Sequence, residues 1–161
     1  NVTLAETGED TMTGGRVAAV KKYVENEDLF CVTYGDGVAD IDITKLIAFH
    51  RAHGKVATIT AVRPPGRFGE LGIDGDSVRG FNEKPQTTEG FINGGFMVFD
   101  AKRIWKYLGD NPATTLEQEP MRQLVADGEL SGPRPLDGRG RPAAVEVAAA
   151  AWPRRRNTGV K

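Results

Sequence analysis

Residues 28–34 read DLFCVTY and run directly into Gly35, Asp36 and Gly37. The run is short, apolar and rich in residues that favour β-structure, so it predicts a buried central strand. The glycines on both sides of Asp36 mark the end of that strand. Open α/β sheets bind their ligands in the crevice at the carboxyl ends of their strands. This stretch therefore predicts the fold class and also indicates the first candidate site.

Strand-like and helix-like segments alternate around this run, which is typical of an α/β layer fold with a mixed sheet and flanking helices. Residues 55–62 predict a second strand. Three shorter segments predict antiparallel strands laid beside the main sheet: 68–73, 77–82 and 91–100. Helices are predicted after Gly14-Gly15, between Asp42 and Gly54, over 101–108, and from near Glu119, because Pro120 fits only a first turn.

The composition is that of one soluble globular domain, since 39% of the 161 residues are hydrophobic and 27% are charged. No apolar run is long enough to cross a bilayer and the first residues lack the features of a signal peptide, so we expect no membrane partner. Cys31 is the single cysteine, which excludes an intrachain disulfide and favours a reducing cytoplasm. Its apolar neighbours predict a small core residue and not a reactive thiol.

The charges are unevenly distributed. Residues 131–161 carry seven cations and two anions, a net charge of +5, whereas residues 1–130 carry 14 Lys and Arg against 20 Asp and Glu, a net charge of −6. An acidic body matches a polyanion poorly, so nucleic acid is not the expected partner. The tail is rich in Arg, Pro, Ala and Gly, as a GC-rich gene is when translated out of frame. We therefore hypothesise a frameshift product, and a basic interaction tail is the alternative.

Asp36 is the first candidate for chemistry. One carboxylate together with phosphate oxygens and water is a common way to hold Mg²⁺, and the flanking glycines would let a phosphate approach closely. Residues 11–16 (TMTGGR) form a glycine-bearing segment before a helix. Arg16 of this segment could donate two hydrogen bonds to one phosphate. The alternatives are that Asp36 lies in a simple turn and that Thr13 and the glycines only cap the helix.

Two further segments carry polar residues that suit a sugar phosphate. Lys84 offers a point charge and Glu83 an acceptor for hydroxyls, although an exposed ion pair would look the same. Asn93 precedes two glycines in an apolar strand, which predicts a bulge or a close ligand approach. By contrast, His50 and His53 have no neighbouring ligand pattern and are interpreted as surface residues.

Six motifs follow one another along the chain: 11–16 (TMTGGR), 34–40 (YGDGVAD), 64–69 (PPGRFG), 83–85 (EKP), 92–96 (INGGF) and 114–120 (TTLEQEP). Together they resemble glucose-1-phosphate cytidylyltransferases, a branch of the sugar-phosphate nucleotidyltransferases. The resemblance runs from residue 1 to about residue 130. It implies a Rossmann-like nucleotidyltransferase fold, incomplete in this chain, within a cytoplasmic enzyme that forms a homo-oligomer when complete.

The resemblance also implies a reaction. A Mg²⁺-dependent enzyme would transfer a cytidylyl group from CTP to α-D-glucose 1-phosphate, giving CDP-glucose and pyrophosphate for bacterial O-antigen synthesis. Asp36 would bind the metal and, with Lys84, form the catalytic pair. The nucleotide would face Thr11, Arg16 and Gly35. The sugar-phosphate pocket would be lined by Gly69, Glu83, Lys84 and Asn93.

Two features of the family are not matched: its opening strand with a Gly-Gly-x-Gly-Thr-Arg loop, and a second metal-binding aspartate expected beyond residue 130. We therefore expect residues 1–130 to be a partial nucleotidyltransferase domain with impaired activity, followed by the unmatched tail 131–161. One alternative is an inactive remnant that binds sugar phosphate or assembles with a partner. Another is a thymidylyl- or uridylyltransferase of the same family.

Overall fold

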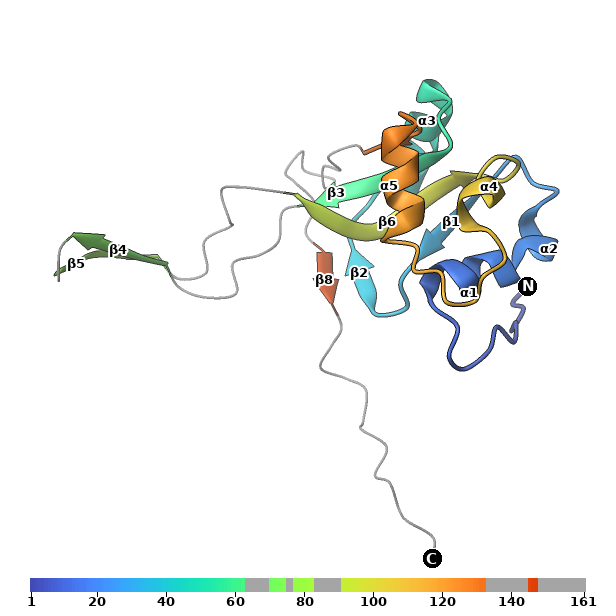
Figure 1. The fold of residues 1–161 in the computed structure, drawn as a ribbon. Helices are drawn as coiled ribbons and strands as arrows, with labels where there is room; N and C mark the ends of the chain where they lie inside the picture. Colours follow the sequence, from blue (N-terminus) through green and yellow to red (C-terminus); the bar gives the residue numbers. More distant parts are fainter. Residues whose placement is uncertain (63–69, 75–76, 83–90, 133–144, 148–161) are drawn as a thin grey trace, which may run out of the picture.

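The computed structural model describes residues 1–62, 70–74, 77–82, 91–132 and 145–147. Its main sheet has four strands, in the order β1 (Leu29–Thr33), β6 (Ile92–Asp100), β3 (Ala57–Val62) and β7 (Leu130–Ser131) (Figure 1). Strand β6 is antiparallel to both β1 and β3, whereas β3 and β7 are parallel. The predicted α/β class with a mixed sheet is confirmed.

Two antiparallel pairs of strands complete the described β-structure. Strand β4 (Glu70–Asp74) pairs with β5 (Ser77–Asn82), which confirms strands in both predicted segments. Strand β2 (Gly37–Ala39), directly after Asp36, pairs with β8 (Val145–Val147). The tail thus contributes a short strand beside the turn that carries Asp36.

The order of strands corrects two predictions. The run at 29–33 is not central, because β1 lies at one edge of the main sheet as described, and β6 is an interior strand of that sheet and not an addition beside it. An apolar run shows that a strand has a buried face, but long-range pairing decides its neighbours. Cys31 is likewise exposed and not a core residue, because it alternates along the edge strand with Phe30, which is buried.

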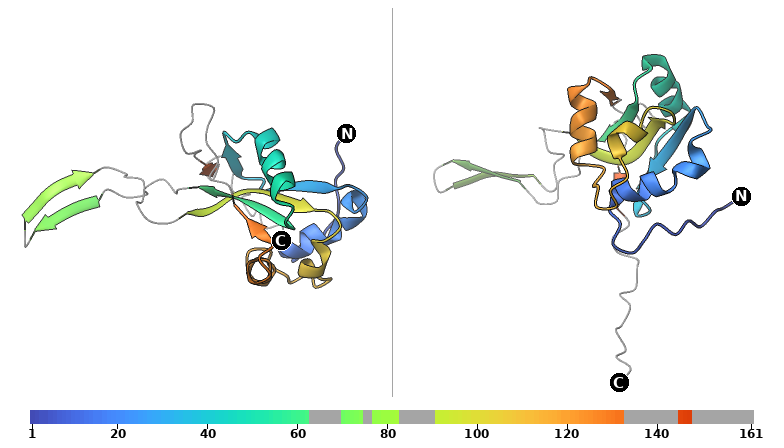
Figure 2. Two further views of the ribbon diagram at one scale, coloured as in Figure 1. Left: turned by 90° about the horizontal axis from the view of Figure 1, so that it is seen from above. Right: turned by 45° about the vertical axis from the view of Figure 1, so that its right-hand side comes forward.

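Helices cover both faces of the main sheet. Figure 2 shows α3 (Ile43–His53) on one face and α1 (Thr13–Ala19), α4 (Trp105–Leu108) and α5 (Glu119–Ala126) on the other. Helix α3 begins and ends as predicted, because the Asp42 carboxylate accepts a hydrogen bond from Lys45 N at 3.0 Å and Gly54 has φ +64°. The predicted first-turn position of Pro120 in α5 is also confirmed. The helix predicted after Gly14-Gly15 begins earlier, at Thr13, and ends at Ala19, and α2 (Lys21–Val24) follows it after Val20.

The core lies between the sheet and the helices α1, α4 and α5, which cover one face of the sheet. The Phe30 ring stacks on Trp105 with ring centroids 5.5 Å apart and lies 5.6 Å from Phe99. Leu124 of α5 and Leu108 of α4 are buried in the same cluster. Each fully buried side chain of this kind stabilises the fold by roughly 1.5–3 kcal/mol.

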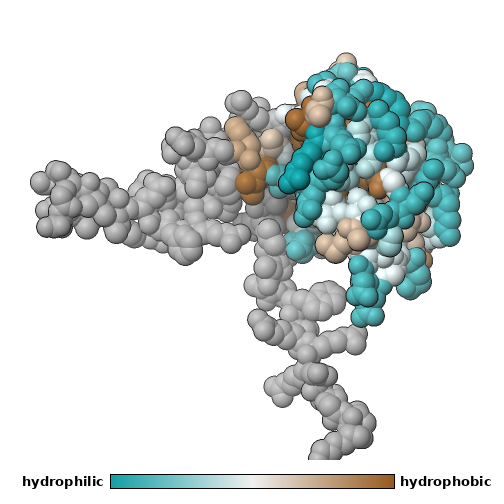
Figure 3. Space-filling model, viewed as in Figure 1, coloured by the Kyte–Doolittle hydropathy of each residue, from teal (hydrophilic) through white to brown (hydrophobic). Residues whose placement is uncertain are grey.

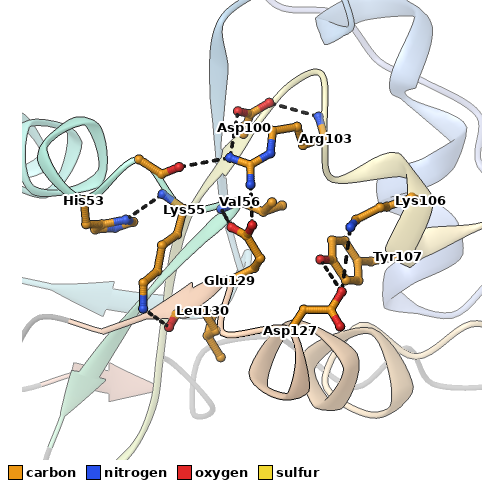
Figure 4. A network of polar contacts seen from close by, with 11 residues as sticks. His53, Lys55, Val56, Asp100, Arg103, Lys106, Tyr107, Asp127, Glu129 and Leu130 are labelled. Carbon is orange, nitrogen blue, oxygen red and sulfur yellow. Dashed lines mark hydrogen bonds and ion pairs between the residues drawn. The ribbon is translucent and has the colours of Figure 1, made fainter.

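A polar network lies at the end of the sheet where β6 ends and where β3 and β7 begin (Figure 4). We call its members the strand-end network: Gly54, Val56, Asp100, Arg103 and Glu129. The Arg103 guanidinium donates to Gly54 O at 2.9 Å and to the Glu129 carboxylate. The other Glu129 oxygen accepts from Val56 N at 3.0 Å. The network joins the ends of α3 and β6 to the starts of β3 and β7.

Hydrophilic residues cover most of the described surface on the face seen in Figure 3. The hydrophobic residues on that face gather mainly beside the grey segments. In the part of the chain that the structure describes, no helix has the length and hydrophobicity to span a bilayer.

Candidate functional site

A cleft of about 800 Å³ opens between α1, β1 and the turn that follows β1. Its walls include Thr13, Arg16, Cys31, Tyr34, Gly35 and Asp36. Three predicted site residues from two separate motifs, Arg16, Gly35 and Asp36, therefore lie in one cleft.

Asp36 lies at the tip of the turn, which is closed by a hydrogen bond from Gly37 N to Tyr34 O at 3.3 Å. The Asp36 side chain is exposed, and within the described residues no side chain donates a hydrogen bond to its carboxylate. A Cβ added at Gly35 would meet no atom within 4 Å, so this side of the turn is open. The turn thus presents a carboxylate that accepts no hydrogen bond from a described side chain, beside open space.

Arg16 lies on α1 and faces the same cleft. In this structure its guanidinium donates to Thr7 Oγ1 at 2.8 Å and to Glu9 O at 2.9 Å. These partners belong to the N-terminal segment, and both are neutral oxygens. A phosphate bound at Arg16 would replace these two acceptors with charged oxygens, which form stronger hydrogen bonds.

Thr11 lies outside the cleft. It lines a smaller neighbouring hollow of about 210 Å³, together with Gly15 and Pro112. Its predicted contact with a nucleotide is not tested by this placement and stays a prediction. Gly69, Glu83 and Lys84 lie outside the described residues, so their predicted roles also stay predictions.

The glycines of the 11–16 motif pack α1 closely against residues 112–116. A Cβ at Gly15 would lie 2.5 Å from Pro112 O, and one at Gly14 would lie 2.8 Å from the Thr114 side chain. The amide of Gly15 donates to Thr114 O at 3.1 Å, so it is not free for an anion. Thr13 is no side-chain cap either, because the N-cap position of α1 is Met12 and no side chain caps it. Close helix packing is the reason for these two glycines.

Four polar side chains meet at the rim of the cleft; we call Thr13, Tyr34, Asn93 and Glu117 the cleft network. Glu117 accepts hydrogen bonds from the Tyr34 hydroxyl and, at 2.7 Å, from Thr13 Oγ1. The Tyr34 oxygen in turn accepts from Asn93 Nδ2 at 3.0 Å. The Thr13 oxygen also accepts from Leu116 N at 2.9 Å. Each member comes from a different motif among the six.

Protonation in the cleft network follows from these bonds. Burial and the neighbouring Glu117 carboxylate raise the pKa of Tyr34, so its hydroxyl keeps the proton. Burial alone would raise the pKa of Glu117, but the hydrogen bonds from Tyr34 and Thr13 lower it overall. The network therefore holds one ionised carboxylate against neutral donors. Although Cys31 counts as an exposed residue, partial desolvation in the cleft wall raises the pKa of its thiol, which keeps the thiol neutral.

Asn93 starts the bulge that its glycines predict. Opposite it, the register of β3 shifts between Ile59 and Ala61, and Gly95 adopts φ +77°. The Asn93 Oδ1 atom accepts from Gly95 N at 2.8 Å, which fixes the bulge from within. The predicted bulge is confirmed. Both functional groups of the Asn93 amide make contacts inside the chain, so binding of a sugar hydroxyl would add to or replace them.

His50 is buried, so its interpretation as a surface residue is wrong. Lys55 N donates to His53 Nδ1 at 2.9 Å, so a neutral His53 carries its proton on Nε2. That nitrogen lies 2.7 Å from Thr58 Oγ1, and the Thr58 hydroxyl can then donate to His50 Nδ1 at 2.8 Å. The three side chains form a directed chain of hydrogen bonds between α3 and β3. Within the described ranges, no three His, Cys, Asp or Glu residues cluster as a metal site.

The contact between Tyr34 and Glu117 was not predicted from the sequence. Both stand inside quoted motifs, YGDGVAD and TTLEQEP, but they are 83 positions apart. The available signal was that each is a polar residue inside one of the six motifs. Only the fold shows that they touch.

Comparison with known proteins identifies the family. The family model for nucleotidyl transferases matches residues 1–133. The chain belongs to the nucleotidyl transferase family. It is 55% identical over 130 residues to glucose-1-phosphate cytidylyltransferase of Salmonella typhi, covering 81% of this chain and 50% of that protein. The catalytic subunit beta of Xenopus tropicalis mannose-1-phosphate guanylyltransferase is 28% identical over 135 residues, covering 80% of this chain and 37% of that protein.

A solved structure supports the fold. HddC from Yersinia pseudotuberculosis matches with a TM-score of 0.56 at 24% identity, covering 86% of this chain and 57% of that chain. At this identity the match shows the Rossmann-like fold alone. The chain spans about half the length of the curated relatives it matches.

Proposed function

We propose that this nucleotidyl transferase chain belongs to an enzyme that transfers a cytidylyl group from CTP to α-D-glucose 1-phosphate. The observation that carries the proposal is the 55% identity to the Salmonella cytidylyltransferases, over a segment that contains the cleft with Asp36, Gly35 and Arg16. A cytoplasmic location and a homo-oligomer when complete stay predictions of the same proposal.

The residues of the cleft fit a magnesium ion in part. Mg²⁺ is commonly held by one or two carboxylates with phosphate oxygens and water, and Asp36 is an exposed carboxylate on an open turn. When bound, Mg²⁺ would neutralise negative charge on the phosphate oxygens. Among the cleft-lining residues that the structure describes, Asp36 is the single carboxylate. The described part of the cleft thus offers one ligand and would depend on phosphate for the others.

In the proposed reaction a phosphate oxygen of glucose 1-phosphate attacks the α-phosphorus of CTP. The bond between that phosphorus and the bridging oxygen breaks, pyrophosphate leaves, and CDP-glucose keeps the α-phosphate. Arg16 would bind a phosphate of CTP, and Lys84, Glu83, Gly69 and Asn93 would orient the sugar phosphate. Positioning and charge neutralisation would supply most of the acceleration, and no protein nucleophile is required.

A calorimetric titration tests this proposal. We expect the 161-residue chain to bind glucose 1-phosphate in the presence of Mg²⁺ and CTP, and Asp36→Asn to weaken that binding. Asp28→Asn is the matched control, because Asp28 comes directly before the first residue of β1 and is also exposed. Equal binding by wild type and Asp36→Asn would overturn the proposal.

The second candidate is a chain that binds sugar phosphate without catalysis. It is favoured by the single carboxylate among the described lining residues of the cleft. We expect the 161-residue chain to show no measurable CDP-glucose synthesis, and turnover of CTP with glucose 1-phosphate would rule this candidate out. Assays with dTTP and UTP in place of CTP test the related thymidylyl and uridylyl reactions.

A further inference from the structure

The Glu117 carboxylate connects the two walls of the cleft. One oxygen accepts from Tyr34, the residue before Gly35 and Asp36, and the other accepts from Thr13 on α1. Thr13 and Arg16 are three residues apart on α1 and so share a face of that helix. We propose that Glu117 is a positioning residue that fixes the Asp36 turn relative to Arg16. This proposal rests on the proposed function, which makes Asp36 and Arg16 the phosphate-facing groups.

The Asp36 turn depends on Tyr34 for its position. Tyr34 N donates to Gly95 O at 3.4 Å, and Tyr34 O accepts the hydrogen bond from Gly37 N that closes the turn. The Tyr34 ring lies against Gly95, where an added Cβ would be 2.8 Å from the ring atom Cδ2. Ring, hydroxyl and backbone of Tyr34 are therefore all held, and the turn follows directly from its backbone.

Asp36 itself has no comparable restraint. In the described part of the chain no donor side chain contacts its carboxylate, and a Cβ at Gly35 would have no neighbour within 4 Å. The contacts of Tyr34 thus help to place the backbone from which the Asp36 carboxylate projects. Among these contacts, the bond to Glu117 is charge-assisted, and such hydrogen bonds are about twice as strong as neutral ones.

The charge of Glu117 matters on both walls. An ionised carboxylate accepts at both oxygens, so Tyr34 and Thr13 can donate to it at the same time. A glutamine has the same shape but only one acceptor oxygen, and its NH₂ group would face one of the two hydroxyls. Glu117→Gln therefore loses one of these two hydrogen bonds and the charge that strengthens the other, while the volume of the side chain stays the same.

The test combines amide exchange with metal–nucleotide affinity. Loss of one hydrogen bond to a charged group changes an equilibrium by about tenfold. In Glu117→Gln we expect the Gly37 amide to exchange with solvent about tenfold faster, and the Mn²⁺–CTP complex to bind about tenfold more weakly. We expect Tyr34→Phe to change both in the same direction. Glu119→Gln, two residues away and exposed, is the matched control and should behave as wild type.

Affinity for the Mn²⁺–CTP complex separates positioning from overall stability, because a loss of stability alone leaves the affinity of the folded chain as in wild type. Unchanged Gly37 exchange in Glu117→Gln would overturn the proposal. So would unchanged Mn²⁺–CTP affinity in Glu117→Gln when Asp36→Asn loses binding. If wild type and Asp36→Asn bind Mn²⁺–CTP equally or not at all, the proposed function fails and the positioning role falls with it.

Discussion

The cleft network and the strand-end network are built alike, since in each one glutamate, Glu117 or Glu129, joins segments far apart in the sequence. They differ in what they leave unpaired. In the strand-end network, Glu129 meets a guanidinium and the amide of the buried Val56. In the cleft network, Glu117 meets two neutral hydroxyls, while the nearby Asp36 carboxylate keeps no donor among the described side chains. The first arrangement stabilises a fold, whereas the second keeps a charge available for a ligand.

The largest effect is expected where α1 packs against the segment that carries Glu117. Gly15→Ala would place a Cβ 2.5 Å from Pro112 O and 2.8 Å from Pro112 Cα. Alanine usually stabilises a helix relative to glycine, but here the clash should dominate and lower the free energy of unfolding by about 3 kcal/mol. Urea denaturation measures the change.

Gly35→Ala is the matched control for this substitution. The added methyl group would meet nothing within 4 Å, so the free energy of unfolding should stay close to that of wild type. If both variants lose the same stability, the glycines of α1 have no special packing role.

A smaller effect is expected in the strand-end network. Glu129→Ala leaves the buried Val56 amide without its acceptor and leaves Arg103 with only the longer ion pair to Asp100, at 3.9 Å, among the described residues. An unsatisfied buried donor reduces the free energy of unfolding by about 2 kcal/mol. Glu119→Ala, an exposed glutamate of α5, should change stability far less. Equal losses in the two variants would show that Glu129 contributes no more than a surface charge.

The smallest effect concerns the His50–Thr58–His53 chain. Burial lowers the pKa of both histidines, and His53 lowers that of His50 further. Because the folded values lie below the ordinary value of about 6.5, the unfolded chain takes up protons first as the pH falls. Stability should therefore be complete above about pH 6.5. It should decline as the pH drops from there toward the lowered folded pKa values.

Urea denaturation between pH 8 and pH 5.5 measures this decline, and His50→Gln should lose part of it. The comparison with the variant removes the contribution of carboxylates, which both proteins share. An identical pH dependence in wild type and His50→Gln would contradict the lowered pKa of His50.

The sequence predicted elements whose ends are encoded locally. The Asp42 cap, the end of α3 at Gly54, the start of α5 near Pro120 and the bulge at Asn93 all follow from side chains next to the feature. The edge position of β1 and the exposure of Cys31 were missed, because strand order depends on partners that are more than 50 residues away.

The sequence also predicted part of the arrangement at the candidate site. Arg16, Gly35 and Asp36 line one cleft, since the motif around Asp36 ends a strand and Arg16 lies on the adjoining helix. Thr11 lies in the neighbouring hollow, which Gly15 and Pro112 also line. The contact between Tyr34 and Glu117 depends on the whole fold and could not be inferred from either motif alone.

The most direct test of the Asp36 site is a Mn²⁺ titration of the wild-type chain with CTP, followed by paramagnetic broadening of its amide signals. If Asp36 holds the cation, the amides of Gly35, Asp36 and Gly37 broaden first, and Asp36→Asn abolishes that broadening. Broadening that begins elsewhere, or that persists unchanged in Asp36→Asn, would contradict the assignment of this carboxylate as the metal ligand.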